Sequence, residues 1–256
     1  MAIYDYTGTE IPFEDKTDIV KKFTGKNIII LADSIFDYET PDGFNIGYWL
    51  NKACGANVYN WAQGGTCMQK GKADNYDPYS FAGMADALAT GTFTDQEKYQ
   101  EDRSFTTQVA EMKAFDMTTA DYLIVAYGTN DFWLEVTEAP ETNLSDEFDK
   151  NTFIGAFNYG IKTLLTKYPT LKILCVGMQR MSQVSGKTGE TVTGDAWAEA
   201  LKEASSKLSV PYVDIYSDSL INKYTIGTLC NGQPHLSHEG KLRYVALIEN
   251  ALNLYY

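Results

Sequence analysis

Five short apolar runs recur along the chain and are separated by stretches with helical periodicity. The runs cover residues 27–32, 57–61, 122–127, 171–176 and 210–215. The first run, Asn-Ile-Ile-Ile-Leu-Ala, is apolar at nearly every position, which is typical of a strand covered on both faces. Strands that alternate with helices indicate a parallel sheet with helices on both sides. The sequence therefore predicts an α/β fold, a three-layer α/β/α sandwich with a central five-stranded parallel sheet.

The helices between these runs are indicated by the spacing of their apolar residues. We expect helices over residues 46–53, 153–168 and 195–208. A final helix should begin after Ser237, because serine is a favoured N-cap residue. The apolar side of this helix should be formed by Leu242, Val245, Ile248 and Leu252.

The segments outside this pattern are a polar N-terminus and two long insertions. Residues 1–26 carry turn signals and predict a strap or hairpin ahead of a single domain over residues 27–256. Residues 66–105 and 133–150 leave from the carboxyl ends of strands, and we expect them to form long loops that wall a site.

The composition excludes several classes of protein. The 256 residues are 44% hydrophobic, which suits one domain with a large core. The net charge of −13 should repel phosphate backbones and anionic lipids, so we expect neither nucleic acid nor a membrane as a partner. No apolar run approaches the ~20 residues that a membrane-spanning helix needs. The irregular spacing of the four cysteines predicts free thiols at Cys54, Cys67, Cys175 and Cys230.

The N-terminal residues lack the basic and apolar regions of a signal peptide. A cytoplasmic location and a place in a cell-surface or phage assembly are therefore both open. The sequence does not indicate an oligomeric state.

Polar and small residues follow the first two predicted strands, where ligands bind in open α/β sheets. Asp33 and Ser34 follow the first strand, at a turn where the serine hydroxyl can be exposed and its N–H can face a substrate oxygen. The alternative is that these residues only cap the next helix. Gly64 and Gly65 follow the second strand, where they permit either close approach of the backbone to a ligand or simply a tight turn.

Further candidates follow the third strand and precede the last helix. Asn130 lies in the sequence Gly-Thr-Asn-Asp, and its amide can donate a hydrogen bond to a developing oxyanion. The alternative for Asn130 is an Asx turn. The chain has two histidines. His235, on a proline-containing loop before the last helix, is the expected general base, and His238 is the less favoured alternative.

Taken in order, these four segments resemble the Ser, Gly, Asn and His blocks of the SGNH (GDSL-type) esterase and lipase superfamily. Residues 32–35 resemble the GDS block, with Ala32 in place of glycine, and residues 60–66 resemble the glycine block. Residues 128–131 match the GxND block, and His235 followed by Gly240 resembles the histidine block. The resemblance extends over about residues 27–252 and implies the flavodoxin-like fold of SGNH hydrolases.

The resemblance also implies a catalytic set and a reaction. Ser34 would be the nucleophile of a serine esterase and His235 its base. The backbone N–H groups of Ser34 and Gly65 and the side-chain amide of Asn130 would form the oxyanion hole. Such a hydrolase requires no metal and no organic cofactor.

The chain departs from the family pattern ahead of the histidine. The aspartate expected three residues before His235 is replaced by Gly232, and Asn231 is the nearest polar residue on that side. We therefore expect a Ser-His dyad in which His235 is oriented by a backbone carbonyl, by Asn231 or by an acid from elsewhere in the chain. The alternative is an inactive site.

The expected substrate is a small acyl ester, most simply an acetyl ester, carried on a carbohydrate. Aromatic residues make up 13% of the chain and suit stacking against sugar rings. The candidate substrate-binding residues are Asp33, Trp61, Trp133 and Arg180.

Two other functions fit parts of the pattern. The replacement by Gly232 raises the alternative of a weakly active or inactive hydrolase scaffold that serves as a glycan-binding module. A nucleotide-binding protein with a flavodoxin-like sheet is disfavoured, because Asp33 and Ser34 stand where a glycine-rich phosphate loop would be needed.

Overall fold

The computed structural model of the chain describes residues 3–4, 10–11, 21–37, 43–135, 139–184, 191–231 and 234–256. Near the N-terminus, β1 (Ile3–Tyr4) pairs with β2 (Glu10–Ile11) as an antiparallel hairpin. Phe23 is buried, with its ring 5.4 Å from that of Tyr122. Residues 21–26 therefore pack with the domain that follows them.

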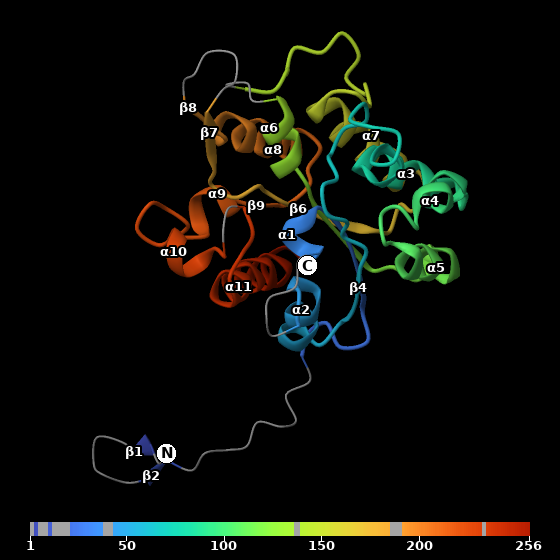
Figure 1. The fold of residues 1–256 in the computed structure, drawn as a ribbon. Helices are drawn as coiled ribbons and strands as arrows, with labels where there is room; N and C mark the ends of the chain where they lie inside the picture. The colour runs from blue at the N-terminus through green and yellow to red at the C-terminus, as the bar shows by residue number, and fades with distance from the viewer. Residues whose placement is uncertain are drawn as a thin grey trace.

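The central sheet has five parallel strands in the order β4-β3-β5-β6-β9 (Figure 1). In chain order these strands are β3 (Asn27–Ala32), β4 (Asn57–Asn60), β5 (Tyr122–Ala126), β6 (Lys172–Val176) and β9 (Tyr212–Val213). Strand β9 is shorter than the predicted run over residues 210–215. Its chain leaves the sheet early because the Asp214 carboxylate accepts the Ser217 N–H at 3.0 Å and starts helix α9 (Ile215–Asp218).

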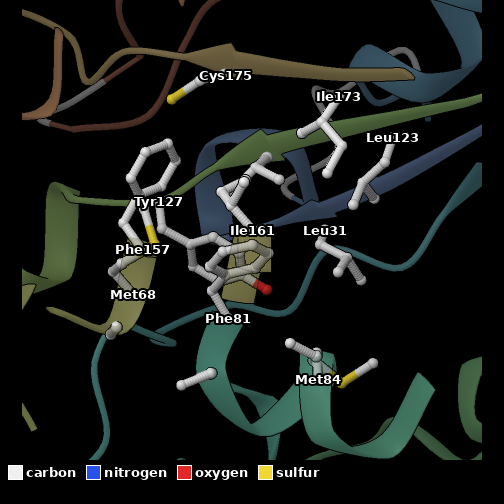
Figure 2. Packing of buried hydrophobic residues seen from close by; sticks show 14 of the residues in the cluster. Leu31, Met68, Phe81, Met84, Leu123, Tyr127, Phe157, Ile161, Ile173 and Cys175 are labelled. Atoms are coloured by element: carbon white, nitrogen blue, oxygen red, sulfur yellow. The ribbon is translucent and has the colours of Figure 1, made fainter. Parts of the chain in front are cut away.

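The strands present alternate side chains to two separate cores. Ile29 and Leu31 of β3 belong to one core, whereas Ile28 and Ile30 belong to the other. Figure 2 shows the first core, in which Phe81 and other helix residues point toward the strands. This burial on both faces explains why the strands are apolar throughout.

Helices cover both faces of the sheet (Figure 1). The first core is closed by α3 (Phe81–Thr90), α5 (Thr106–Ala114), α7 (Phe153–Lys167) and α8 (Asp195–Lys207). The second is closed by α2 (Ile46–Cys54) and α11 (His238–Tyr255). The predicted three-layer α/β/α sandwich is thereby confirmed.

Short helices begin directly where strands end. They are α1 (Ser34–Asp37) after β3, α6 (Thr129–Glu135) after β5 and α9 after β9. Because the strands are parallel, these helix starts lie at one edge of the sheet. The remaining elements are α4 (Thr94–Tyr99), α10 (Ile226–Leu229), the 3-10 turns η1 (Asp77–Tyr79) and η2 (Met117–Thr119), and an antiparallel hairpin of β7 (Ser182–Val184) and β8 (Thr191–Thr193).

The first insertion differs from its prediction as a long loop. Residues 81–99 contain α3 and α4, and α3 is a core helix. Its ends carry signals visible in the sequence. The Ser80 hydroxyl accepts the Gly83 N–H at 3.1 Å, and Gly91 ends the helix with φ +69°.

The last helix begins as predicted, with the Ser237 hydroxyl accepting the Gly240 N–H at 3.1 Å. The prediction for Leu242 is wrong, because its side chain is 41% exposed. Lys241 and Tyr244 face the interior instead. The Lys241 ammonium donates to the Phe44 carbonyl at 2.9 Å, and the Tyr244 hydroxyl donates to the Gln179 side-chain oxygen at 3.2 Å. Because these polar groups have partners, they can be buried where a leucine was expected.

All four cysteines are free, as predicted, and the structure also buries all four. Within the described ranges, no helix is long and apolar enough to span a bilayer. The same part of the chain contains no cluster of three His, Cys, Asp or Glu side chains that could hold a metal ion.

The contact between α7 and α3 makes a prediction about packing. A Cβ atom at Gly160 of α7 would overlap the ring of Phe81 on α3. Gly160→Ala should therefore destabilise the fold by roughly 1–3 kcal/mol through overpacking, despite the ~1 kcal/mol that alanine gains in helix propensity. Urea unfolding monitored by circular dichroism measures this difference.

Gly227→Ala on α10 is the matched control, because a Cβ atom there meets no neighbour within 4 Å. Adding Phe81→Leu to Gly160→Ala should recover part of the loss. A Gly160→Ala protein as stable as the unaltered one would contradict this description of the core.

Candidate active site

Ser34 lies at the sharp turn between β3 and α1. The strand ends at Ala32, and the helix begins at Ser34 itself, whose side chain is partly exposed. Asp33 between them fixes the turn: its N–H donates to the Ala126 carbonyl at 3.3 Å, and its carboxylate accepts the Ile35 N–H at 3.0 Å. The turn after the first strand is therefore tied to the end of β5.

Asp33 was expected to contact substrate, but its side chain is only 1% exposed. Burial raises the pKa of this carboxyl to about 7, and the charge of Asp131 adds to the rise. Hydrogen bonds from Ile35 and Thr129 act in the opposite direction. Asp33 thus shapes the turn that carries Ser34 and presents no surface to a ligand.

Residues 63–66 form a turn, here called the glycine turn, directly beside Ser34. The Thr66 N–H and hydroxyl both donate to the Gln63 carbonyl, at 3.4 and 2.7 Å. Gly65 has φ +77°, as the third position of a type II turn requires. A Cβ atom built on Gly64 would lie 3.7 Å from the Ser34 Cβ. The structure thereby brings the first and second predicted segments together.

The glycine turn is anchored by residues from neighbouring strand ends. Asp37 of α1 accepts the Gly64 N–H at 3.0 Å. The Asn130 amide of α6 donates to the Thr66 carbonyl at 2.7 Å. The buried carboxylate of Asp131 accepts the N–H groups of Met68 and Gln69, at 2.8 and 3.2 Å. These contacts join the segments that follow β3, β4 and β5.

Two backbone N–H groups at this junction, those of Ser34 and Gly65, have no hydrogen-bond partner among the residues that the structure describes. An asparagine amide carries two N–H groups, and Asn130 uses one of them on Thr66. Unused donors grouped beside a serine hydroxyl are the arrangement that can stabilise an oxyanion.

The loop with His235 is fixed to the same edge of the sheet through Gln179. The Asn231 N–H donates to the His235 carbonyl at 2.9 Å, which closes the loop. The Gln179 amide donates to the Pro234 carbonyl, and its oxygen accepts the Tyr244 hydroxyl at 3.2 Å. Gln179 and Tyr244 also line a small cavity together with Asp33.

His235 itself is partly buried. Burial, followed by the positive charge of Lys241, lowers the pKa of this imidazole below its ordinary value of 6.5. The neutral form, which can accept a proton, is therefore favoured at neutral pH. His238, the alternative base, packs edge-on against Trp49 at 5.1 Å between ring centres. Gly232, the departure from the family pattern, lies outside the described residues.

The three other predicted substrate-binding residues lie in different places. Trp61 is a core residue, 1% exposed, whose ring N–H donates to Glu111 at 2.6 Å, so it offers no face to a sugar. Trp133 follows Asn130 on α6 and is 42% exposed. Arg180 stacks over the Tyr216 ring at 4.4 Å, in a groove that includes none of the segments around Ser34.

Sequence reasoning missed Arg103 on the first insertion and the contact that it makes with Tyr76 of the same insertion. The Arg103 guanidinium donates to the Gly64 carbonyl and stacks over the Tyr76 ring at 3.8 Å. No motif marks these residues, because they reach the glycine turn through the fold of the insertion. Gln179 was also missed, although it follows β6 as a polar residue at a strand end.

The raised pKa of Asp33 predicts how stability depends on pH. The unfolded chain loses this proton near pH 3.8, whereas the folded chain holds it until about 7, so the free energy of unfolding should fall as pH rises between these values. Asp33→Asn mimics the protonated carboxyl and should make this fall less steep. Urea unfolding at about pH 5 and about pH 8 measures the effect. An identical pH dependence in both proteins would contradict the burial of an acid here.

No protein-family model matches the chain, and no curated protein matches it significantly. Solved structures do resemble it over nearly its whole length. A protein from Lactobacillus plantarum is 17% identical, with a TM-score of 0.65 over 91% of this chain and 99% of its own.

Two further structures have descriptive names. A member of the lipolytic protein G-D-S-L family from Veillonella parvula is 16% identical, with a TM-score of 0.53 over 90% of this chain and 98% of its own. The lipase/acylhydrolase from Enterococcus faecalis is 14% identical, with a TM-score of 0.51 over 89% of this chain and 95% of its own. The chain therefore has the fold of the GDSL-type (SGNH) hydrolases.

Proposed function

We propose that the protein is a serine esterase with Ser34 as nucleophile and His235 as general base. The observation that carries this proposal is the pair of unused N–H groups, on Ser34 and Gly65, beside a partly exposed serine hydroxyl. The shared fold with lipolytic GDSL-type proteins supports the same class of reaction.

The first half of the reaction transfers the acyl group to the enzyme. His235 accepts the proton of the Ser34 hydroxyl as the oxygen forms a bond to the ester carbonyl carbon. The carbonyl oxygen becomes an oxyanion that accepts hydrogen bonds from the N–H groups of Ser34 and Gly65 and from Asn130. The intermediate then expels the alcohol, which leaves with the proton from His235.

The second half releases the acid. His235 accepts a proton from water as the water oxygen attacks the acyl-enzyme carbonyl. Collapse of this second intermediate breaks the bond to Ser34, and the proton returns from His235 to the Ser34 oxygen. The lowered pKa of His235 suits both steps, because the imidazole starts each one in its neutral form.

The absence of the usual aspartate from the sequence before His235 favours a dyad. In the serine-protease template, Asp→Asn in the triad cost about 10⁴ in rate, because the imidazole adopts the wrong tautomer. The loop contacts of Gln179 and Asn231 hold the backbone around His235 and contribute to its positioning.

The proposed substrate is a small acyl ester, most simply an acetyl ester on a carbohydrate. Trp133 supports this choice, because its exposed ring lies one helical turn beyond Asn130 and can stack on a sugar. Replacing Trp133 should therefore matter more for an acetylated oligosaccharide than for an aryl acetate.

A turnover assay with 4-nitrophenyl acetate tests the proposal. Ser34→Ala and His235→Ala should each lower kcat by several orders of magnitude, because each removes a group that makes or breaks a bond. Ser206→Ala on the exposed side of α8 and His238→Ala are matched controls and should keep their turnover.

Two results would contradict the proposal. One is turnover that survives in Ser34→Ala. The other is no turnover by the unaltered protein together with measurable binding of an acetylated oligosaccharide, which would favour a glycan-binding module instead.

A further inference from the structure

The Gly64–Gly65 peptide is the central peptide of the glycine turn. In turns of type I and type II this peptide has opposite orientations, and glycine at both central positions permits either one. Gly65 at φ +77° sets the type II orientation in this structure. Something other than local sterics must therefore hold this peptide in one state.

Arg103 contacts this peptide on its carbonyl side. Its guanidinium donates to the Gly64 carbonyl oxygen and stacks over the Tyr76 ring at 3.8 Å. The Gln63 side chain donates back to the Arg103 carbonyl at 3.4 Å. The insertion thus contacts the glycine turn at two places, its first residue, Gln63, and its central peptide.

Tyr76 also packs on the glycine turn. A Cβ atom on Gly65 would lie 2.6 Å from Cε1 of the Tyr76 ring, so this ring packs directly on the Gly65 backbone. Arg103 stacks over the same ring and donates to the Gly64 carbonyl, so both side chains pack against the glycine turn.

A trans peptide is planar, and its C=O and N–H point in opposite directions. A donor on the Gly64 carbonyl therefore directs the Gly65 N–H to the side away from Arg103. If this peptide flipped, its carbonyl would lose a charged donor and the N–H would face that donor instead. A positively charged donor on the carbonyl also polarises the peptide and strengthens its N–H as a donor.

We propose that Arg103 is a positioning residue for the oxyanion hole. It holds the Gly64–Gly65 peptide in the orientation that leaves the Gly65 N–H available to substrate. The inference rests on the proposed esterase function. Arg103 itself touches no substrate: it acts through the peptide it holds.

The test compares Arg103→Met, Arg103→Lys and the control Arg243→Met. Arg243 is matched because its guanidinium also donates to a backbone carbonyl, that of Asp218 at 2.6 Å, on a different part of the fold. Kinetics with 4-nitrophenyl acetate and inhibition by a trifluoromethyl ketone, which forms a tetrahedral adduct with a serine, provide two readouts.

Arg103→Met should lower kcat by about 10- to 100-fold with little change in KM, which is less than the roughly 10²–10³ lost when an oxyanion donor is removed outright. Affinity for the ketone should fall by a similar factor. Arg103→Lys should recover part of both, because lysine keeps a charged donor without the planar stack on Tyr76. Arg243→Met should retain both values.

A third readout is independent of turnover. In protein labelled with ¹⁵N-glycine, the Gly65 amide resonance should move in Arg103→Met and stay in place in Arg243→Met. The inference is overturned if the Gly65 resonance stays in place in Arg103→Met and Arg103→Lys, or if both keep full kcat and ketone affinity while Ser34→Ala is inactive. Failure of the esterase proposal looks different: the unaltered protein then shows no turnover at all.

Discussion

Hydrogen bonds that two carboxylates accept and one amide donates hold the glycine turn against Ser34, and the geometry of the site depends on them. Asp37 accepts the Gly64 N–H, Asp131 accepts the N–H groups that follow the turn, and the Asn130 amide binds the Thr66 carbonyl. These anchors come from α1 and α6, which begin where β3 and β5 end. The parallel register of the strands on either side of β3 therefore sets the distance between the serine and the turn.

The same edge of the sheet holds two buried acids. Burial raises the pKa of Asp33 to about 7 and that of Asp131 to about 6. Both carboxylates accept backbone N–H groups, and these hydrogen bonds fix the direction of the chain. Burial of each acid costs part of the folding free energy. At this edge of the sheet the chain thus uses buried carboxylates as structural hydrogen-bond acceptors. No carboxylate stands three residues before His235, where the SGNH pattern places one.

Much of the fold follows from the sequence because burial on both faces leaves a clear pattern. Strand β3 and helices α7 and α8 begin and end within a residue or so of prediction, since their apolar spacing and end signals agree. The insertion was mistaken for a loop because its polar and aromatic residues hide α3, whose buried face is rich in small residues such as Ala82 and Ala85. The prediction for Leu242 failed because the preceding residue, Lys241, faces the interior instead. Its ammonium has a hydrogen-bond acceptor there, the Phe44 carbonyl.

Part of the candidate site was predictable because its residues lie a few positions after the end of a strand. Ser34, Gly65 and Asn130 meet this condition, and the structure brings their segments together. Trp61 was misjudged because an aromatic residue near a strand end can equally be core, and its ring N–H has a partner in Glu111. Arg103 could not be found, because its contact with Gly64 spans 39 positions and depends on the path of the whole insertion.

Covalent labelling with a fluorophosphonate tests the central claim most directly, because this reagent phosphonylates only a serine that has been activated and loses fluoride as it does so. The predicted result is one adduct per chain, located on the peptide with Ser34 by mass spectrometry. The adduct should be absent in Ser34→Ala and should form much more slowly in His235→Ala. An unaltered protein that takes up no label, or a Ser34→Ala protein that is labelled as fast as the original, would contradict the claim.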